Sequence, residues 1–215
     1  MRILVVRPQP GADATAARLA ALGHEAVVQP LLETRPLPWV VPTALPDAVI
    51  LSSAAAVRHA GAQADALKAV PAHPVGEATA RAARAAGWID VSTGPGTMQA
   101  LLDGLAAGQY LHLAGVDVTA VVVPPGLCLT RIAVYETPLQ PLPALPDIAA
   151  VLLHSPRTAG QFAAEWDRLG GRRAALALFA ISPATLAAAG GGWGSAVAAP
   201  KPNDVALLAM LPKAL

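Results

Sequence analysis

Short apolar runs alternate with longer alanine-rich stretches along the whole chain. The runs are rich in valine, isoleucine and leucine, and some contain no polar residue, as in Val49–Leu51 and Val151–Leu153. Such runs are typical of parallel strands that helices cover on both faces. The alanine-rich stretches favour helices, so the pattern predicts repeated strand–helix units and parallel sheets. The expected strands span residues 3–6, 26–29, 48–51, 72–75, 88–92, 111–114, 128–134, 150–154, 175–181 and 196–199.

The ends of the expected helices carry residues that helix termini prefer. Glycine follows several of them, as at Gly23 and Gly87, which is a common C-terminal stop. Ser155 and Ser182 are each followed by proline, which suits the first helical position. Asp13 is expected to cap the first helix. The other residues expected to begin helices after strands are Ser53, Gly76, Thr97, Ser155, Ser182 and Asn203.

The two halves of the chain repeat one another. The segment Ala44-Leu45-Pro46-Asp47 recurs as Ala144-Leu145-Pro146-Asp147, and Gly87-Trp88 recurs as Gly192-Trp193. Each half also has a proline-rich segment at the same place. A nearly constant offset indicates a duplication, which taken literally gives domains at residues 1–108 and 109–215.

The expected caps also suggest a binding edge. In a parallel sheet, the carboxyl ends of the strands and the N-termini of the following helices lie on one edge. Backbone N–H groups there attract anions, so two such edges around a shared cleft would hold an anionic ligand. For any one residue, a purely structural cap is the more economical explanation. Gly94-Pro95-Gly96 is too short for a phosphate loop, so nucleotide binding has little support.

Composition narrows the possible functions. The chain is 54% hydrophobic and 13% charged, which excludes a disordered segment. A net charge of +1 without a Lys/Arg stripe gives no basis for nucleic-acid binding. The apolar run at Met1 is too short for a signal peptide, and no run approaches the roughly 18 residues of a membrane span, so a cytoplasmic protein is expected. Cys128 is expected to be a buried, inert thiol, and no Cys/His cluster has metal-binding spacing.

Few charged or aromatic side chains stand at the expected edges. Arg7, Arg157 and Lys201 are candidates for carboxylate binding, or are solvated loop residues. Tyr135 is a candidate proton donor or ligand anchor, or it packs at a junction between domains. No Ser/His/Asp triad or spaced carboxylate pair is present. The histidines at strand ends are expected to be structural: His112 and His154.

Taken together, these segments resemble the uroporphyrinogen-III synthase family. The resemblance extends from Met1 to about Met210 and rests on the order and spacing of short motifs. Two positions depart from the family pattern: Ser182 replaces a glycine, and Ala114 precedes Gly115 where an arginine is often found. Either departure would weaken substrate binding. The motifs are Ile3–Pro8, Val49–Val57, Val75–Ala80, Ile132–Thr137 and Leu152–Pro156, with Thr185 matching the family's second Gly-x-x-Thr turn.

The family fold implies domains that do not follow the duplication. It has two flavodoxin-like (Rossmann-like) parallel-sheet α/β domains, joined by two extended connectors, with a cleft between them. The first half gives two strands to domain 1 and three to domain 2, and the second half does the reverse. The implied boundaries are 1–33 plus 141–215 for domain 1, 45–130 for domain 2, and 34–44 and 131–140 for connectors that form a hinge.

The resemblance implies cyclisation of hydroxymethylbilane, a linear tetrapyrrole polycarboxylate, to uroporphyrinogen III, with loss of water and inversion of ring D. Such a lyase of haem biosynthesis needs no metal or cofactor and is expected to be monomeric. The preceding pathway enzyme is a possible partner that passes the substrate directly to this protein. Family analogy makes Tyr135 catalytic, assisting loss of hydroxide. The implied substrate-binding residues are Arg7, Ser53, Ala54, Gly76, Glu77, Thr79, Thr97, Ser155, Arg157, Ser182, Thr185 and Lys201.

Two other functions stay open at this point. A non-catalytic two-domain binding protein or sensor for an anionic small molecule, arising as a degenerate paralogue, would use the same helix N-termini. A sugar- or nucleotide-binding α/β enzyme would need a phosphate loop, which the sequence lacks.

Overall fold

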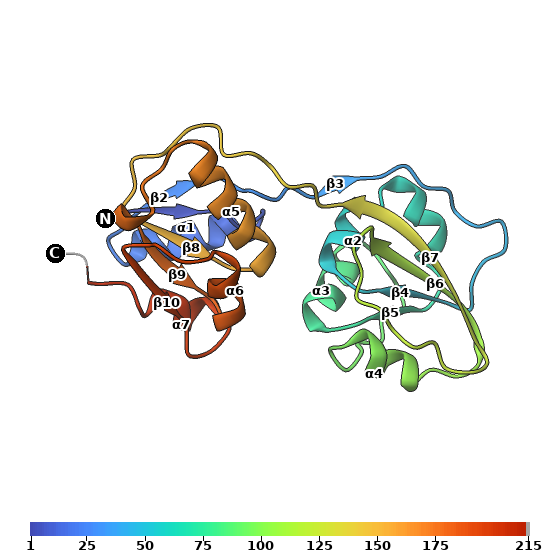
Figure 1. Ribbon diagram of the computed structural model, residues 1–215. Helices are drawn as coiled ribbons and strands as arrows, with labels where there is room; N and C mark the ends of the chain where they lie inside the picture. Colours follow the sequence, from blue (N-terminus) through green and yellow to red (C-terminus); the bar gives the residue numbers. More distant parts are fainter. Residues whose placement is uncertain (214–215) are drawn as a thin grey trace. The chain divides into compact units, whose positions relative to one another are not determined.

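The computed structural model describes residues 1–213, which form two compact units (Figure 1). Unit 1 comprises Met1–Glu33 and the chain from Pro138 onward, and unit 2 comprises Thr34–Thr137. The chain therefore leaves unit 1, builds unit 2 and returns. Unit 2 spans the midpoint of the sequence repeat, so the literal halves 1–108 and 109–215 are not the structural units. None of the helices in the described part is both long and apolar enough to cross a membrane.

The sheet of unit 1 is parallel throughout and has the order β2-β1-β8-β9-β10. This is the flavodoxin-like order, in which the direction of winding reverses between β1 and its neighbour β8. The reversal places the ends of β1 and β8 where such folds bind ligands. The strands are β1 (Arg2–Val5), β2 (Glu25–Val28), β8 (Ala150–Leu153), β9 (Ala177–Ala180) and β10 (Ser195–Ala198).

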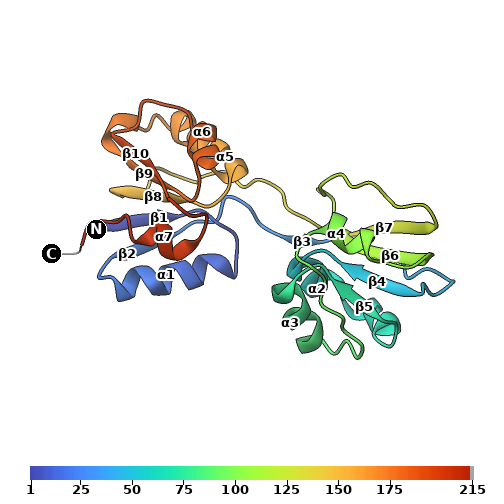
Figure 2. The same cartoon turned by 90° about the horizontal axis from the view of Figure 1, so that it is seen from below.

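Helices cover both faces of this sheet. Figure 2 shows α1 and α7 on one face and α5 and α6 on the other. Successive strand residues face opposite sides, so Ile3 and Val5 pack toward α1 while Leu4 and Val6 pack toward α5. The apolar runs are thus explained by burial on both faces. The helices are α1 (Gly11–Ala21), α5 (Pro156–Arg168), α6 (Pro183–Ala188) and α7 (Asp204–Leu208), with a 3₁₀ turn η2 (Arg173–Ala175).

The sheet of unit 2 has the order β5-β4-β6-β7-β3. Its strands are parallel except β3, which pairs antiparallel with β7 at the edge. Pro36 lacks an N–H group and is tolerated there because an edge strand needs fewer ladder hydrogen bonds. The strands are β3 (Arg35–Pro36), β4 (Ala48–Leu51), β5 (Ala72–Pro74), β6 (Gly108–Gly115) and β7 (Leu127–Glu136).

Helices also cover both faces of the sheet of unit 2. One face packs on α2, η1 and α3 through Val49 and Leu51, and the other packs on α4 through Ala48 and Ile50. The winding reverses between β4 and β6, as it does between β1 and β8 in unit 1. The elements are α2 (Ala54–His59), η1 (Ala62–Leu67), α3 (Glu77–Ala85) and α4 (Met98–Asp103).

Two expected elements of unit 2 differ in the structure. Residues 88–92 form no strand, and only Val91 bridges to β5. Trp88 is buried against α2 and α3, and the chain then bends at Ile89 and Asp90, so only the residues around Val91 come alongside β5, where Ala72 N–H donates to Asp90 O and Ser92 N–H donates to Ala72 O. Most of the expected connector at 131–140 is the second half of β7, which pairs in parallel with β6 as far as Tyr135 and, at its end, antiparallel with Arg35–Pro36.

Two single-residue expectations are wrong. Asp13 does not cap α1, which begins at Gly11; the carboxylate lies in the first turn and accepts a hydrogen bond from Gln9. Cys128 is exposed rather than buried. Its neighbours Leu127 and Leu129 pack toward the α4 side, so strand alternation turns Cys128 to the opposite face, outside the core.

Candidate functional site

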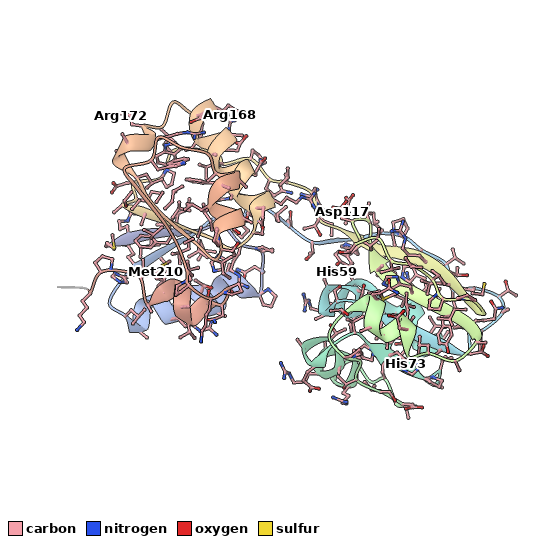
Figure 3. All side chains as sticks on the ribbon, turned by 60° about the horizontal axis from the view of Figure 1, so that its bottom comes forward. His59, His73, Asp117, Arg168, Arg172 and Met210 are labelled. Atoms are coloured by element: carbon pink, nitrogen blue, oxygen red, sulfur yellow. The ribbon has the colours of Figure 1, made fainter. Side chains whose placement is uncertain are left out.

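A cavity of about 480 Å³ lies in unit 2 at the carboxyl edge of its sheet. The adjacent strands β4 and β6 end there, at the point where the winding of the sheet reverses, which is where open α/β sheets bind ligands. The loop after β6 forms one wall, and Figure 3 shows Asp117 in it. The hydroxyl and imidazole groups that line the cavity belong to Ser52, Ser53, Thr97, His112, Thr119 and Tyr135.

Tyr135, near the end of β7, is held at two points. Its hydroxyl lies 3.1 Å from Ser53 Oγ, and either atom can donate in this pair. Ser53 is fixed in turn because it caps α2, with its Oγ accepting from the backbone N–H of Ala56 at 3.0 Å. The tyrosine ring lies against Gly115, where an added Cβ would come within 2.8 Å of Tyr135 Cζ. Gly115 therefore leaves the space that the ring occupies.

A hydroxyl–imidazole pair opens into the same cavity. Ser52 Oγ lies 2.8 Å from His112 Nε2. His112 lies in β6 and is 5% exposed. Burial, and secondarily the charge of Arg131, lower the pKa of His112 to about 4. The imidazole is therefore neutral near pH 7, and its Nε2 accepts or donates according to the tautomer.

The neutral state of His112 makes the stability of the protein depend on pH. The pKa is about 4 in the folded protein and has the ordinary value of 6.5 when unfolded. Between these values the unfolded state binds more protons, so this stability is complete above pH 6.5 and is lost as pH falls toward 4. The shift corresponds to about 3 kcal/mol. Urea titrations at about pH 7 and pH 4.5 should show a larger loss in wild type than in His112→Gln; equal losses would contradict this origin.

In unit 1, a charged cluster occupies the equivalent edge, beside β1 and β8. Asp204, the first residue of α7, accepts from His154 Nε2 at 2.8 Å, Arg7 Nη1 at 3.4 Å and Thr15 Oγ1 at 3.3 Å. It also forms an ion pair with Arg18. Burial alone would raise the pKa of Asp204, but hydrogen bonds from His154 and Arg18 outweigh it and hold that pKa below its ordinary value. Arg7, a predicted binding residue, therefore belongs first to a stabilising network.

The structure brings only part of the predicted site together. Tyr135, Ser53 and Thr97 line the cavity of unit 2. Ser155 and Ser182 cap α5 and α6 in unit 1. Arg157 lies in the first turn of α5, and Lys201 lies in the loop before α7. Four predicted residues belong to unit 2 but do not line its cavity: Ala54, Gly76, Glu77 and Thr79.

Two threonines of the predicted site are buried in their helices. Thr185 is 0% exposed and its Oγ1 lies 3.0 Å from Ser182 Oγ, inside the first turn of α6. Thr79 is 7% exposed in α3. A ligand would reach the Thr185 hydroxyl only if the helix opened, so that hydroxyl belongs to the start of α6. Glu77 is exposed on the same helix and pairs with Arg81 and Arg84.

Sequence reasoning missed Ser52 and Asp204 and took His112 as purely structural. One available signal was strand alternation, since Ser52 follows Ile50 by two positions and so faces the same side of β4. Ile50 pairs with His112 across the sheet, but that register is visible only in the structure. No group of three or more His, Cys, Asp or Glu side chains within residues 1–213 is arranged to hold a metal ion.

A family model matches this chain, and solved structures resemble its fold. The model of the family "Uroporphyrinogen-III synthase HemD" matches residues 13–209. The fold is similar to uroporphyrinogen-III synthetase from Helicobacter pylori 26695, with 17% identity, 98% of each chain covered and a TM-score of 0.66. It is also similar to a mutant uroporphyrinogen III synthase from Thermus thermophilus, with 17% identity, 97% of this chain and 96% of that chain covered, and a TM-score of 0.55.

These structural likenesses show a shared fold, and no curated protein sequence matches the chain significantly. The family model, in contrast, extends over nearly the whole sequence and both units. The chain belongs to the uroporphyrinogen-III synthase HemD family.

Proposed function

We propose that this chain cyclises hydroxymethylbilane to uroporphyrinogen III, with loss of water and inversion of ring D. Family membership supports the reaction. The structural observation that carries the proposal is the Tyr135–Ser53 hydroxyl pair, which lines a cavity at the carboxyl edge of the unit 2 sheet. A cavity of about 480 Å³ is large enough for part of a tetrapyrrole, such as the ring that reacts first.

Tyr135 assists the first step, which is the loss of the hydroxyl group from the hydroxymethyl substituent of ring A. The C–O bond breaks as the pyrrole nitrogen supplies its electron pair, and the departing oxygen takes a proton and leaves as water. A phenol hydroxyl can donate that proton, and Ser53 fixes its direction. The product is a reactive azafulvenium cation on ring A, which keeps its N–H hydrogen.

The later steps depend mainly on positioning. The substituted carbon of ring D attacks to give a spiro intermediate, which fragments and recloses with ring D inverted. Unaided closure gives the unrearranged type I isomer, so the protein must hold ring D in the less accessible pose. The reaction loses water and changes no oxidation state, and we propose that it proceeds without a cofactor.

The substrate carboxylates need partners that the cavity supplies only in part. Neither lysine nor arginine is among the described residues that line it, so hydroxyl groups must bind them in unit 2. Ser53 and Thr97 take this role in the proposal. The other residues proposed to bind carboxylates are cationic or capping residues of unit 1: Arg7, Ser155, Arg157, Ser182 and Lys201.

The test is direct. Purified protein is incubated with freshly prepared hydroxymethylbilane, and the uroporphyrinogen isomers are separated after oxidation. We expect the type III isomer. Type I product alone would remove the enzymatic function and leave a binding protein or sensor for an anionic small molecule.

Replacing Gly115 by alanine tests whether Tyr135 must occupy its observed place. The new Cβ would lie 2.8 Å from Tyr135 Cζ, so the ring must move away from Ser53. We expect kcat to fall about tenfold, as for other small misplacements of a reacting group. The melting temperature should change little, because the displaced atoms are at the end of a side chain beside a cavity. Unchanged turnover in the folded variant would show that this position is not needed.

Three further properties complete the proposal. We infer a monomer, because large exposed apolar side chains such as Val40, Ile89 and Val205 belong to separate segments. We infer a cytoplasmic location from the balanced charge and composition. Spontaneous closure of hydroxymethylbilane favours direct hand-over from the enzyme that makes it, since free diffusion would lose substrate to the type I isomer.

A further inference from the structure

We infer that Ser52, supported by His112, accepts the proton that ring D loses when the macrocycle closes. This inference rests on the proposed function and assigns to the same cavity a proton acceptor opposite the proton donor Tyr135. Its basis is the 2.8 Å contact between Ser52 Oγ and His112 Nε2, with both residues lining the cavity.

The Ser53–Tyr135 pair and the Ser52–His112 pair lie on opposite sides of the end of β4. Ser53 faces α2 and bonds to Tyr135, which packs against the core on that side. Ser52 bonds to His112, which pairs in register with Ile50, a core residue of the α4 side. Consecutive serines at the end of one strand therefore reach the cavity from two directions. A ligand in the cavity meets one pair on each side.

The reaction needs both a donor and an acceptor of protons. At the final closure, the free α-carbon of ring D forms the new C–C bond while it still carries its hydrogen. Its C–H bond breaks, and the electron pair restores the aromatic pyrrole. The proton passes to Ser52 Oγ as the hydroxyl proton of Ser52 passes to His112 Nε2. The imidazolium then releases a proton to solvent, and Tyr135 regains one from solvent, so no net proton is gained or lost.

The surroundings of His112 suit this role. Burial keeps the pKa of His112 low, so the ring is neutral and able to accept before the step. A pyrrole ring that carries the extra hydrogen is cationic and strongly acidic, so a weak base is sufficient. A buried imidazolium is also unfavourable, which favours prompt release of the proton.

The test uses hydroxymethylbilane carrying deuterium at the free α-carbon of ring D. Ser52→Ala should lower kcat about tenfold and show a larger deuterium isotope effect on type III formation than wild type, because proton removal becomes limiting. His112→Gln can still hydrogen-bond to Ser52 but cannot take up the proton, so it should show the same enlarged effect. Ser52→Thr keeps the hydroxyl and should restore most of the rate. Ser92→Ala, an exposed serine that does not line the cavity, is the matched control.

The outcomes separate this inference from the proposed function. A folded Ser52→Ala protein with the rate of wild type would overturn the inference, and so would a lower rate with an unchanged isotope effect. If wild type forms only the type I isomer, the proposed function fails instead, and with it the basis of the inference. Melting temperatures of all variants confirm that each is folded.

Discussion

Tyr135→Phe should lower kcat for uroporphyrinogen III formation at least tenfold, which is about 1.4 kcal/mol in the activation barrier. The substitution removes one oxygen and leaves the ring on Gly115. Ser53 keeps its bond from the N–H of Ala56, so α2 stays capped. What is lost is the proton donor for the leaving hydroxyl group, and water replaces it poorly because it is not held in place. Steady-state consumption of hydroxymethylbilane measures the change.

Tyr110→Phe is the matched control for this prediction. Tyr110 also lies in unit 2 and is buried, and its hydroxyl donates to the carbonyl oxygen of Ala106 at 2.9 Å. It does not line the cavity. The control removes the same atom and should leave kcat near that of wild type, with some loss of stability. Equal rates in both variants and wild type would remove Tyr135 from the mechanism.

Asp204→Ala should lower the free energy of unfolding by about 3 kcal/mol at neutral pH. The Asp204 side chain is 14% exposed and compensates the charges of Arg7 and Arg18. Removing it also leaves His154 Nε2 without its carboxylate acceptor. The uncompensated charges of Arg7 and Arg18 then repel one another, and the Arg7 side chain, at 30% exposed, has lost much of its solvent contact. Urea unfolding at neutral pH measures the loss.

Asp147→Ala gives the comparison for an exposed ion pair. Asp147 accepts from Arg2 at 2.8 Å, but its side chain is 95% exposed. Solvent screens that pair, so its loss should cost less than about 1 kcal/mol. Similar losses in the Asp147 and Asp204 variants would show that burial of the unit 1 cluster contributes nothing.

Much of the fold could be predicted because local patterns reflect burial. The apolar run of β4 is continuous because helices cover both faces of its sheet. The end of β7 could not be predicted in the same way, because the expected strand stops at residue 134. The last two residues of β7, Tyr135 and Glu136, pair with Pro36 and Arg35, which lie far earlier in the chain. Local pattern holds no information on such a partner.

Residues of the candidate site could be predicted where their own position in the sequence indicates a role. Ser53 stands at a helix start, and Tyr135 matches a family motif that ends a strand. Ser52 and His112 become a pair only through the register of β4 with β6. The role of Asp204 depends on surrounding residues that lie on α1 and just after β1 and β8. Thr185 fails as a ligand contact because capping turns its hydroxyl into the helix.

The isomer ratio as a function of protein concentration tests the central claim most directly. Fresh hydroxymethylbilane is divided among increasing amounts of the wild-type chain, and type I and type III products are quantified. If the chain holds ring D for inversion, the type III fraction rises with protein until the type I isomer is a minor product, and the Tyr135→Phe protein needs much more chain to reach the same fraction. A ratio that stays at the type I product of spontaneous closure, at every concentration, would contradict the account.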